Sequence, residues 1–303
     1  MAAGAVGAYF GARLADAGHD VFFIARGAHL DAIKKNGLKI ESTLGNTTIK
    51  NAKVTDDPKT VGPVEIVLFA VKLWDTEKAA EQAKPLVGPN TRVISLQNGI
   101  DSYDRIAPIV GKDNAVGGAA YIATVIASPG VISHTSPFAR MVGGRMDGKD
   151  DAQLAAFADA AKKANIDIAV TKEINRELWQ KFIFLSSLAS ITAGARQPIG
   201  AIMADADMKA FFRKLMEEVF AVGNATGAGV PGAYIEERMK FAAETAPKGM
   251  KASMAHDLER GNRLELEWLA GKVASLGREL KVPTPANEAA YALLKPYRMG
   301  KSA

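Results

Sequence analysis

Closely spaced glycines near the amino end of the chain constrain its fold more than any other feature. Gly4 and Gly7 match the last two glycines of the dinucleotide-binding fingerprint G-x-G-x-x-G, in which a glycine turn leads from a strand into a helix, and Gly11 follows them. Glycine is required because the backbone must approach a pyrophosphate closely, while free N–H groups of the helix bind the phosphate oxygens. Ala2 stands where the fingerprint has its first glycine. The alternative is an ordinary helix start that contains glycine. We predict a dinucleotide site formed by Gly4, Ala5, Val6 and Gly7.

The segments after this turn alternate between short β-branched or aromatic runs and helical stretches, as far as about residue 170. This alternation is typical of βαβ units, so we predict an α/β, Rossmann-type domain with a mostly parallel sheet. The clearest strands are 21–25, 65–71 and 92–96. Ligands of such sheets bind beyond the carboxyl ends of the strands, where polar residues follow here. We expect these residues to contact a cofactor: Arg26, Lys72, Gln97 and Asn98.

The residue after the strand 21–25 indicates which dinucleotide is bound. Arg26 stands where an NAD-binding domain usually has a carboxylate for the ribose 2′-hydroxyl. A guanidinium binds two oxygens of a 2′-phosphate, so this arginine favours NADPH over NADH. The alternative is a surface arginine at a strand end.

A Rossmann unit also needs an apolar strand before its glycine turn, and here the turn begins at residue 2. Either residues upstream of Met1 form that strand, or the sheet lacks it. Loss of a buried central strand exposes apolar surface on two faces, so we favour the first explanation, an incomplete start.

The rest of the chain changes from extended to helical patterns. Short extended segments at 116–122, 130–134 and 140–143 are expected to be antiparallel strands that close the first domain. From residue 174 on, apolar residues recur at helical spacing, so we predict an all-α second domain. A length of 303 residues also favours two domains, placed at 1–170 and 171–303. The clearest helical segments are 178–193, 208–224 and 264–276.

The composition excludes several classes of protein. The chain has no cysteine, which rules out disulfides and thiolate metal sites and suits a reducing cytoplasm. It shows no signal peptide and no apolar run long enough to span a bilayer. A net charge of +5 suits a phosphorylated cofactor, but no arginine-rich run indicates nucleic acid. No metal is expected, because the histidines lack ligand spacing. They are His19, His29, His134 and His256.

Short motifs also recur along the whole chain. Besides the glycine turn they are Gly18-His19-Asp20-Val21 with Arg26-Gly27, Ala70-Val71-Lys72, Leu96-Gln97-Asn98-Gly99, Leu178-Trp179-Gln180-Lys181, Ser253-Met254 through Asp257 to Glu265-Leu266-Glu267 and Gly271, and Val282-Pro283-Thr284-Pro285-Ala286-Asn287. Each motif is short, but their order and spacing together are specific. On these residues the chain resembles the ketopantoate reductase (2-dehydropantoate 2-reductase) family over nearly its whole length.

The resemblance implies an enzyme that reduces 2-dehydropantoate (ketopantoate) to pantoate with NADPH, in pantothenate and coenzyme A biosynthesis. A hydride passes from the nicotinamide C4 to the keto carbon, and a donor within hydrogen-bond reach protonates the alkoxide. Lys181, in the second domain, is similar in position to the family's catalytic lysine. Glu265 is similar to a glutamate that lies by the cofactor ribose and that lysine. The alternatives are an ammonium that extends to solvent and a solvent-facing glutamate on a helix.

The resemblance also supplies residues for the substrate. Ser253 is similar to the family serine that binds the substrate carboxylate. Met254, Ala255 and His256 are expected to line the same wall.

Further residues are expected beside the cofactor. Lys72 and Asn98 resemble a cofactor-proximal lysine and asparagine, and Asn98 is also assigned to the substrate. Asn98 before Gly99 is otherwise an ordinary turn. Ala123 completes the cofactor-binding set.

The chain departs from the family where members carry asparagines that bind substrate oxygens. Here the corresponding residues are Leu185, Ala189 and Ile199. A site built to bind a hydroxyl rejects analogues that lack it by up to ~10⁴-fold, so these losses change substrate choice. We hypothesise that Leu185 contacts a less hydroxylated, more apolar 2-oxo acid. That holds unless a nearby serine replaces the lost donors: Ser186, Ser187 or Ser190.

Other interpretations remain open. A reductase of another, more apolar 2-oxo acid is the nearest. A non-catalytic NADP-binding sensor is the second, although it has no need for both Lys181 and Glu265. A related β-hydroxyacid dehydrogenase is disfavoured by the pattern from Ser253 to Gly271. The expected partner is a small 2-oxo acid, without nucleic acid or membrane. Apolar helices near the carboxyl end offer surface for a homodimer, with a monomer as the alternative.

Overall fold

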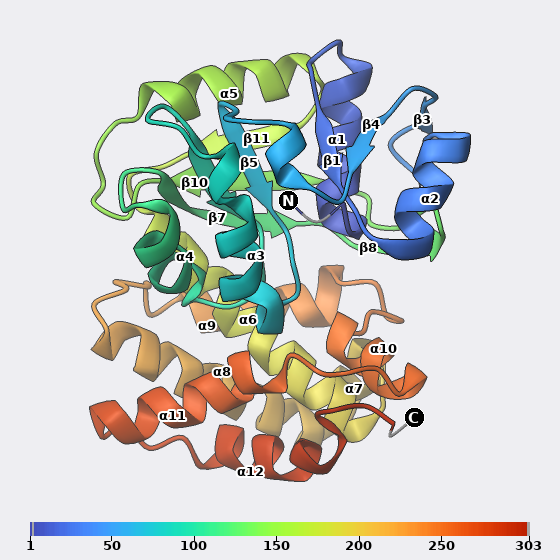
Figure 1. Cartoon of the computed structure of the whole chain (residues 1–303). Helices are drawn as coiled ribbons and strands as arrows, with labels where there is room; N and C mark the ends of the chain where they lie inside the picture. Colours follow the sequence, from blue (N-terminus) through green and yellow to red (C-terminus); the bar gives the residue numbers. More distant parts are fainter. Residues whose placement is uncertain (2, 302–303) are drawn as a thin grey trace. The chain divides into compact units, whose positions relative to one another are not determined.

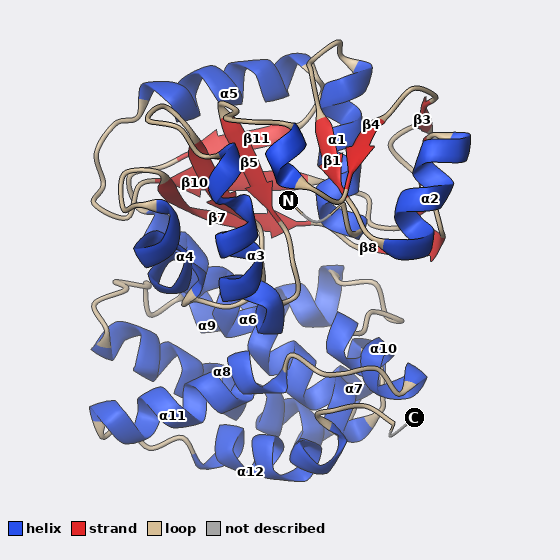
Figure 2. Ribbon diagram, viewed as in Figure 1, coloured by secondary structure: helices blue, strands red, loops and turns tan. Residues whose placement is uncertain are grey.

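The computed structural model describes residues 1 and 3–301, which form two compact units, Met1–Ile174 and Asn175–Ala303 (Figure 1). Ala2, the alanine at the first glycine position of the fingerprint, lies outside the described residues. The strands belong to the first unit, while the regular structure described in the second unit is helical (Figure 2). The predicted fold class, a Rossmann-type domain followed by an all-α domain, is confirmed.

A mostly parallel sheet with the strand order β11-β10-β7-β6-β5 forms the centre of the first unit. β5, β6 and β7 run parallel to one another. A separate parallel pair is formed by β1 and β4. The strands are β1 (Phe22–Ile24), β4 (Lys53–Thr55), β5 (Ile66–Phe69), β6 (Arg92–Ser95), β7 (Ala115–Tyr121), β10 (Arg140–Gly144) and β11 (Asp167–Val170).

The residues before the glycine turn lie between β1 and β5. The N–H of Ala3 donates to the carbonyl of Ile24 in β1, over 2.7 Å. The carbonyl of Met1 accepts from the N–H of Ala70, after β5, over 3.1 Å. These strand-like bonds link the parallel pair to the larger sheet. They bring the carboxyl ends of β1 and β5 to the same edge as those of β6 and β7.

The expected set of antiparallel strands is correct for one pair and wrong for another. β10 pairs antiparallel with β7, as expected. The segment at 130–134, however, belongs to a different sheet with the order β3-β2-β9-β8. There β9 runs parallel to β2 and antiparallel to β8. Its partner β2 lies about ninety residues earlier, and local pattern carries no information on such distant pairing. The strands are β2 (Leu38–Ser42), β3 (Thr47–Ile49), β8 (Thr124–Ser128) and β9 (Val131–His134).

Side chains of the central strands point alternately into two apolar cores, as the period of a strand requires. Val67 and Val93 join the core under α3 and α4. Leu68 and Ile94 face the core that holds α1 and α5. Helices therefore cover both faces of the sheet (Figure 2). The helices are α1 (Ala5–Asp16), α2 (Gly27–Asn36), α3 (Thr76–Ala83), α4 (Ser102–Val110) and α5 (Ala152–Lys163).

The second unit is a bundle of helices around a 22-residue helix, α6. Trp179 of α6 is 4% exposed and packs against Gly223 of α8, where an added Cβ would lie 2.7 Å from the indole ring. This close approach fixes α6 on α8. In the part of the chain that is described, no helix is both long and apolar enough to cross a membrane. The helices are α6 (Ile174–Ala195), α7 (Ile199–Ala204), α8 (Ala206–Ala225), α9 (Tyr234–Lys240), α10 (Ser253–Arg260), α11 (Ala270–Leu280) and α12 (Pro285–Leu294).

The helix expected over 264–276 begins later than expected. α11 starts at Ala270, and a 3₁₀ turn, Leu266–Trp268, precedes it. Leu264 is buried, and its N–H donates to the carbonyl of Arg298 over 2.9 Å. Burial of a non-helical segment, 264–266, therefore contributes to the apolar pattern at this point.

The motif 282–287 has a structural role. Glu218 of α8 is 3% exposed, and its carboxylate accepts from the N–H groups of Ala286 and Asn287 in the first turn of α12. The amide nitrogen of Asn287 also donates to this carboxylate and to the carbonyl of Leu215. A buried carboxylate at a helix amino end satisfies N–H groups that lack partners within the helix. The motif therefore anchors α12 on α8.

We expect Glu218→Ala to lower the free energy of unfolding by about 2–3 kcal/mol, because it leaves buried N–H groups without an acceptor. Urea denaturation followed by circular dichroism measures this change. Lys214→Ala, an exposed change on the same helix, is the control and should alter stability little. Equal stabilities for the two variants would contradict this role of Glu218.

Candidate active site

The amino end of α1 is open to an anion. Gly4 is the residue before the helix, no side chain caps the end, and the first turn has no acidic residue. The N–H groups of Ala5, Val6 and Gly7 therefore lack acceptors within the helix. A Cβ at Gly4 would have only the carbonyl oxygen of Ala70 nearby, at 3.9 Å, so the space beside Gly4 is open to a ligand.

Gly11 serves packing instead of binding. A Cβ at this position would lie 2.7 Å from the ring of Phe23, so the absence of a side chain lets α1 lie against β1. Gly4 and Gly11 thus differ in role: Gly4 belongs to an open turn, and Gly11 permits a close helix–strand contact.

The other candidate cofactor residues follow the carboxyl ends of neighbouring strands. Lys72 comes after β5, Asn98 after β6 and Ala123 after β7, and these strands are adjacent and parallel. Arg26 follows β1 and precedes α2. Lys72, Ala123 and Arg26 are exposed, and Asn98 is partly buried. The first unit therefore collects these residues along one edge, with Lys72 and Arg26 adding positive charge.

Gln97 is buried and hydrogen-bonded within the unit, contrary to the expectation that it contacts a cofactor. It is 6% exposed, and its amide nitrogen donates to the carbonyl of Val71 and to the hydroxyl of Thr76, over 3.1 and 2.9 Å. Gln97 is therefore a brace that joins the ends of β5 and β6 and holds Lys72 and Asn98 near each other. The sequence does not distinguish this role, because Gln97 and Asn98 are both polar residues at a strand end.

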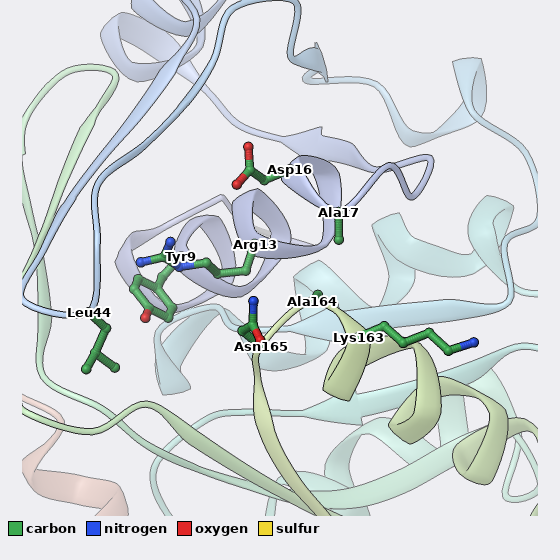
Figure 3. A pocket seen from close by; sticks show the side chains of 8 residues that line it. All are labelled: Tyr9, Arg13, Asp16, Ala17, Leu44, Lys163, Ala164 and Asn165. Atoms are coloured by element: carbon green, nitrogen blue, oxygen red, sulfur yellow. The ribbon is translucent and has the colours of Figure 1, made fainter.

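A pocket of about 250 Å³ lies elsewhere in the first unit (Figure 3). It is formed by the carboxyl halves of α1 and α5, and no predicted site residue lines it. The carboxyl ends of helices carry partial negative charge, which is unfavourable for a dinucleotide phosphate. The pocket is lined by Tyr9, Arg13, Asp16, Ala17, Leu44, Lys163, Ala164 and Asn165.

Lys181 lies on α6, two residues after the buried Trp179. Successive helical positions differ by about 100°, so Lys181 leaves the helix on a different side from Trp179. Burial lowers the pKa of Lys181 to about 8, while the charge of Glu265 opposes this shift. Lys181 is therefore an amine that exchanges its proton near neutral pH.

Glu265 lies in the second unit with Lys181, in the connection before the turn 266–268 and not on a helix. The residue is 7% exposed, so it is not the solvent-facing glutamate of the alternative interpretation. Buried Leu264 and Leu266 fix the backbone on either side. Its negative charge offsets part of the lowering of the Lys181 pKa that burial causes.

The residues expected to bind substrate fall into two groups on α10. Ser253 and His256 are exposed, and their spacing of three residues places them on the same side of the helix. Met254 and Ala255 are 2% and 1% exposed, so in this conformation they pack inside the unit and do not face a ligand.

The family asparagine positions also differ in exposure. Leu185 is partly exposed, one turn after Lys181, whereas Ala189 and Ile199 are 1% and 0% exposed. The serines that follow Leu185 do not replace the missing amides. Ser186 and Ser187 are fully buried, and the hydroxyl of Ser190, 2% exposed, donates to the carbonyl of Ser186. In the turn that follows Lys181 the partly exposed side chains of α6, Phe184 and Leu185, are therefore apolar.

No cluster of His, Asp and Glu side chains suited to a metal ion occurs within residues 1 and 3–301.

Comparison with known proteins identifies the family. A model described as "Ketopantoate reductase PanE/ApbA" matches residues 2–148, and one for the carboxyl-terminal domain of the same family matches 173–298. A 2-dehydropantoate 2-reductase of Mesorhizobium japonicum is 31% identical over 97% of this chain and 95% of its own. The chain belongs to the ketopantoate reductase family. It is accordingly an oxidoreductase, and the predicted resemblance is confirmed.

Solved structures agree with this assignment. A PanE/ApbA family ketopantoate reductase from Ralstonia eutropha JMP134 matches with a TM-score of 0.88 and 32% identity, covering 98% of this chain and 97% of its own. A D-mandelate dehydrogenase, solved with NADH and anilino(oxo)acetate, matches with a TM-score of 0.90 over 98% of this chain and 96% of its own. Its 17% identity shows a shared fold alone.

We expect the ammonium of Lys181 to titrate with a pKa of about 8. In Glu265→Gln the pKa should fall further, because burial is no longer opposed by a nearby carboxylate. Nuclear magnetic resonance of isotope-labelled methyl groups on the lysines measures both values, and Lys181→Ala identifies the signal. Glu259→Gln is the control, since Glu259 pairs with Lys251 instead. A pKa that does not change in Glu265→Gln would contradict the coupling.

Proposed function

We propose that this chain reduces a 2-oxo acid with NADPH, and that the acid is ketopantoate, as the family name indicates. The observation that carries the proposal is the pair formed by Lys181 and Glu265 in the second unit. The carboxylate favours the charged form of an amine that burial would otherwise neutralise. Such an amine protonates an alkoxide at the pH where the enzyme works, which a binding protein does not need.

The residues of the first unit fit a phosphorylated dinucleotide. The uncapped amino end of α1 suits the pyrophosphate, because its N–H groups lack acceptors and Gly4 leaves room beside them. Arg26, exposed after β1, suits a 2′-phosphate, which favours NADPH over NADH. In this assignment Lys72, Asn98 and Ala123 adjoin the nicotinamide half. When bound, NADPH supplies the hydride.

The protein's own part in the reaction is to bind and protonate. The hydroxyl of Ser253, at the start of α10, holds the substrate carboxylate, and the amino end of that helix favours the negative charge. The ammonium of Lys181 donates a hydrogen bond to the keto oxygen and then its proton as the alkoxide forms. Glu265 keeps the amine of Lys181 protonated and oriented. Its carboxylate is also proposed to contact a ribose hydroxyl of NADPH.

A second substrate is favoured by the apolar surface beside Lys181. Leu185 replaces an amide, and the serines after it are buried and unable to reach a ligand. A less hydroxylated, branched 2-oxo acid suits this wall better than ketopantoate. The homodimer and the cytoplasmic location stay predictions from the sequence.

We expect Lys181→Ala to lower NADPH-dependent turnover roughly 10²- to 10⁴-fold, the usual contribution of a proton donor, while NADPH still binds. Spectrophotometric assays that follow the oxidation of NADPH or NADH measure turnover. Fluorescence titration measures the binding of NADPH. In the unmodified chain kcat/KM for reduction should fall as pH rises through about 8, since the protonated amine is the active form.

Lys240→Ala, an exposed change on α9, serves as the control for this experiment. Full turnover in Lys181→Ala would contradict the proposal. NADPH binding without turnover of any 2-oxo acid by the unmodified chain would instead support the sensor.

A matched pair of substrates separates the two candidates. We expect ketopantoate and its analogue without the hydroxyl to differ in kcat/KM by less than ~10-fold, because Leu185 stands where family members have an amide that recognises the hydroxyl. Leu185→Asn should raise the preference for ketopantoate. A large preference for ketopantoate in the unmodified chain, above ~100-fold, would contradict the second candidate and leave ketopantoate as the substrate.

A further inference from the structure

Thr192 lies on the same side of α6 as Lys181, and both are in the second unit. The two positions are 192 − 181 = 11 residues apart, which is about three turns at 3.6 residues per turn. Their side chains therefore leave the helix within about 20° of each other. Leu185 and Leu188 lie between them on this side. The side of α6 that carries the proposed proton donor thus passes into the interior of the unit at Thr192.

The hydroxyl of Thr192 connects α6 to the start of α10. It donates to the carbonyl of Leu188 over 2.6 Å and accepts from the N–H of Ala252 over 3.3 Å. Thr192 is 0% exposed, so no water competes for either bond. Ala252 directly precedes Ser253, the first residue of α10. The bond therefore holds the peptide next to the proposed carboxylate-binding serine.

Other contacts hold the segment 248–252 that leads to Ser253. The N–H of Ile199 donates to the carbonyl of Met250, and that of Gly200 to the carbonyl of Lys248, both over 2.9 Å. A Cβ at Gly200 would lie 2.8 Å from this Lys248 oxygen, so the glycine permits the approach. These bonds reach the segment at its beginning and middle. Thr192 fixes its end, beside Ser253.

We propose that Thr192 is a positioning residue for the substrate: through Ala252 it fixes the hydroxyl of Ser253 relative to Lys181 on the same helix. This inference rests on the proposed roles of Ser253 and Lys181. The distance between those groups must match a 2-oxo acid, whose carboxylate and keto oxygen are adjacent. The bond from Thr192 anchors the serine's peptide to the helix that carries Lys181, about 16 Å along the helix axis from the lysine.

The decisive variant is Thr192→Val, which keeps the shape of the side chain and removes the hydroxyl. The N–H of Ala252 then has no acceptor, and Ser253 is no longer held. A carboxylate contact acts equally in the ground state and the transition state, so its loss raises KM and leaves kcat nearly unchanged. We expect KM for the 2-oxo acid to rise roughly 5- to 30-fold, the effect of one buried hydrogen bond, with KM for NADPH unaltered.

Matched variants separate this role from a general loss of structure. Thr192→Ser retains the hydroxyl and should have the KM of the unmodified chain. Ser190→Ala removes a hydroxyl that makes the same kind of bond within α6, to the carbonyl of Ser186, but does not contact 248–253. It should leave KM unchanged. In a Ser253→Ala background, Thr192→Val should add little, because the two changes act on one contact.

The outcomes distinguish the inference from the function on which it rests. A raised KM in Thr192→Val that Thr192→Ser restores, and that disappears in the Ser253→Ala background, supports the inference. An unchanged KM, a fall in kcat alone, or additive effects with Ser253→Ala would overturn it while the proposed function stands. If the unmodified chain reduces no 2-oxo acid with NADPH, the proposed function fails, and the inference fails with it.

Discussion

A buried ammonium opposed by a nearby carboxylate is the interaction on which the rest of this account depends. Burial alone favours the neutral amine, and the charge of Glu265 partly restores the charged form of Lys181. The balance gives a pKa of about 8, close to the pH at which proton donation is efficient. Neither the burial of Lys181 nor the charge of Glu265 alone gives this pKa. The remaining architecture of the second unit can be understood as the means of holding these two groups in place.

The family motifs divide into those that hold the site and those that belong to it. Trp179 packs on Gly223 and fixes the helix that carries Lys181. Glu218 and Asn287 anchor α12 on α8 and are not themselves candidate site residues. In the first unit Gln97 braces two strand ends, whereas its neighbour Asn98 stays partly exposed. Adjacent residues of one motif thus have different physical roles.

The sequence predicts the fold class and the family well, because both depend on local patterns: the glycine turn, alternating strands and helical spacing. It predicts less well what depends on distant contacts. The pairing of β9 with β2, and the non-helical backbone at Glu265, are decided by partners far along the chain. The packing of Met254 inside the unit, where the family resemblance implies a substrate wall, also depends on such contacts. Thr192 escapes notice for the same reason, because its partner Ala252 is sixty residues away.

A crystal structure of this chain with NADP⁺ and a 2-oxo acid tests the central claim most directly. The account predicts that the keto oxygen lies within about 3.2 Å of Lys181 Nζ, the reach of a proton donor, and that the carboxylate of the same molecule contacts Ser253. A bound 2-oxo acid whose keto oxygen contacts another group, with the amine of Lys181 directed into solvent, would contradict it.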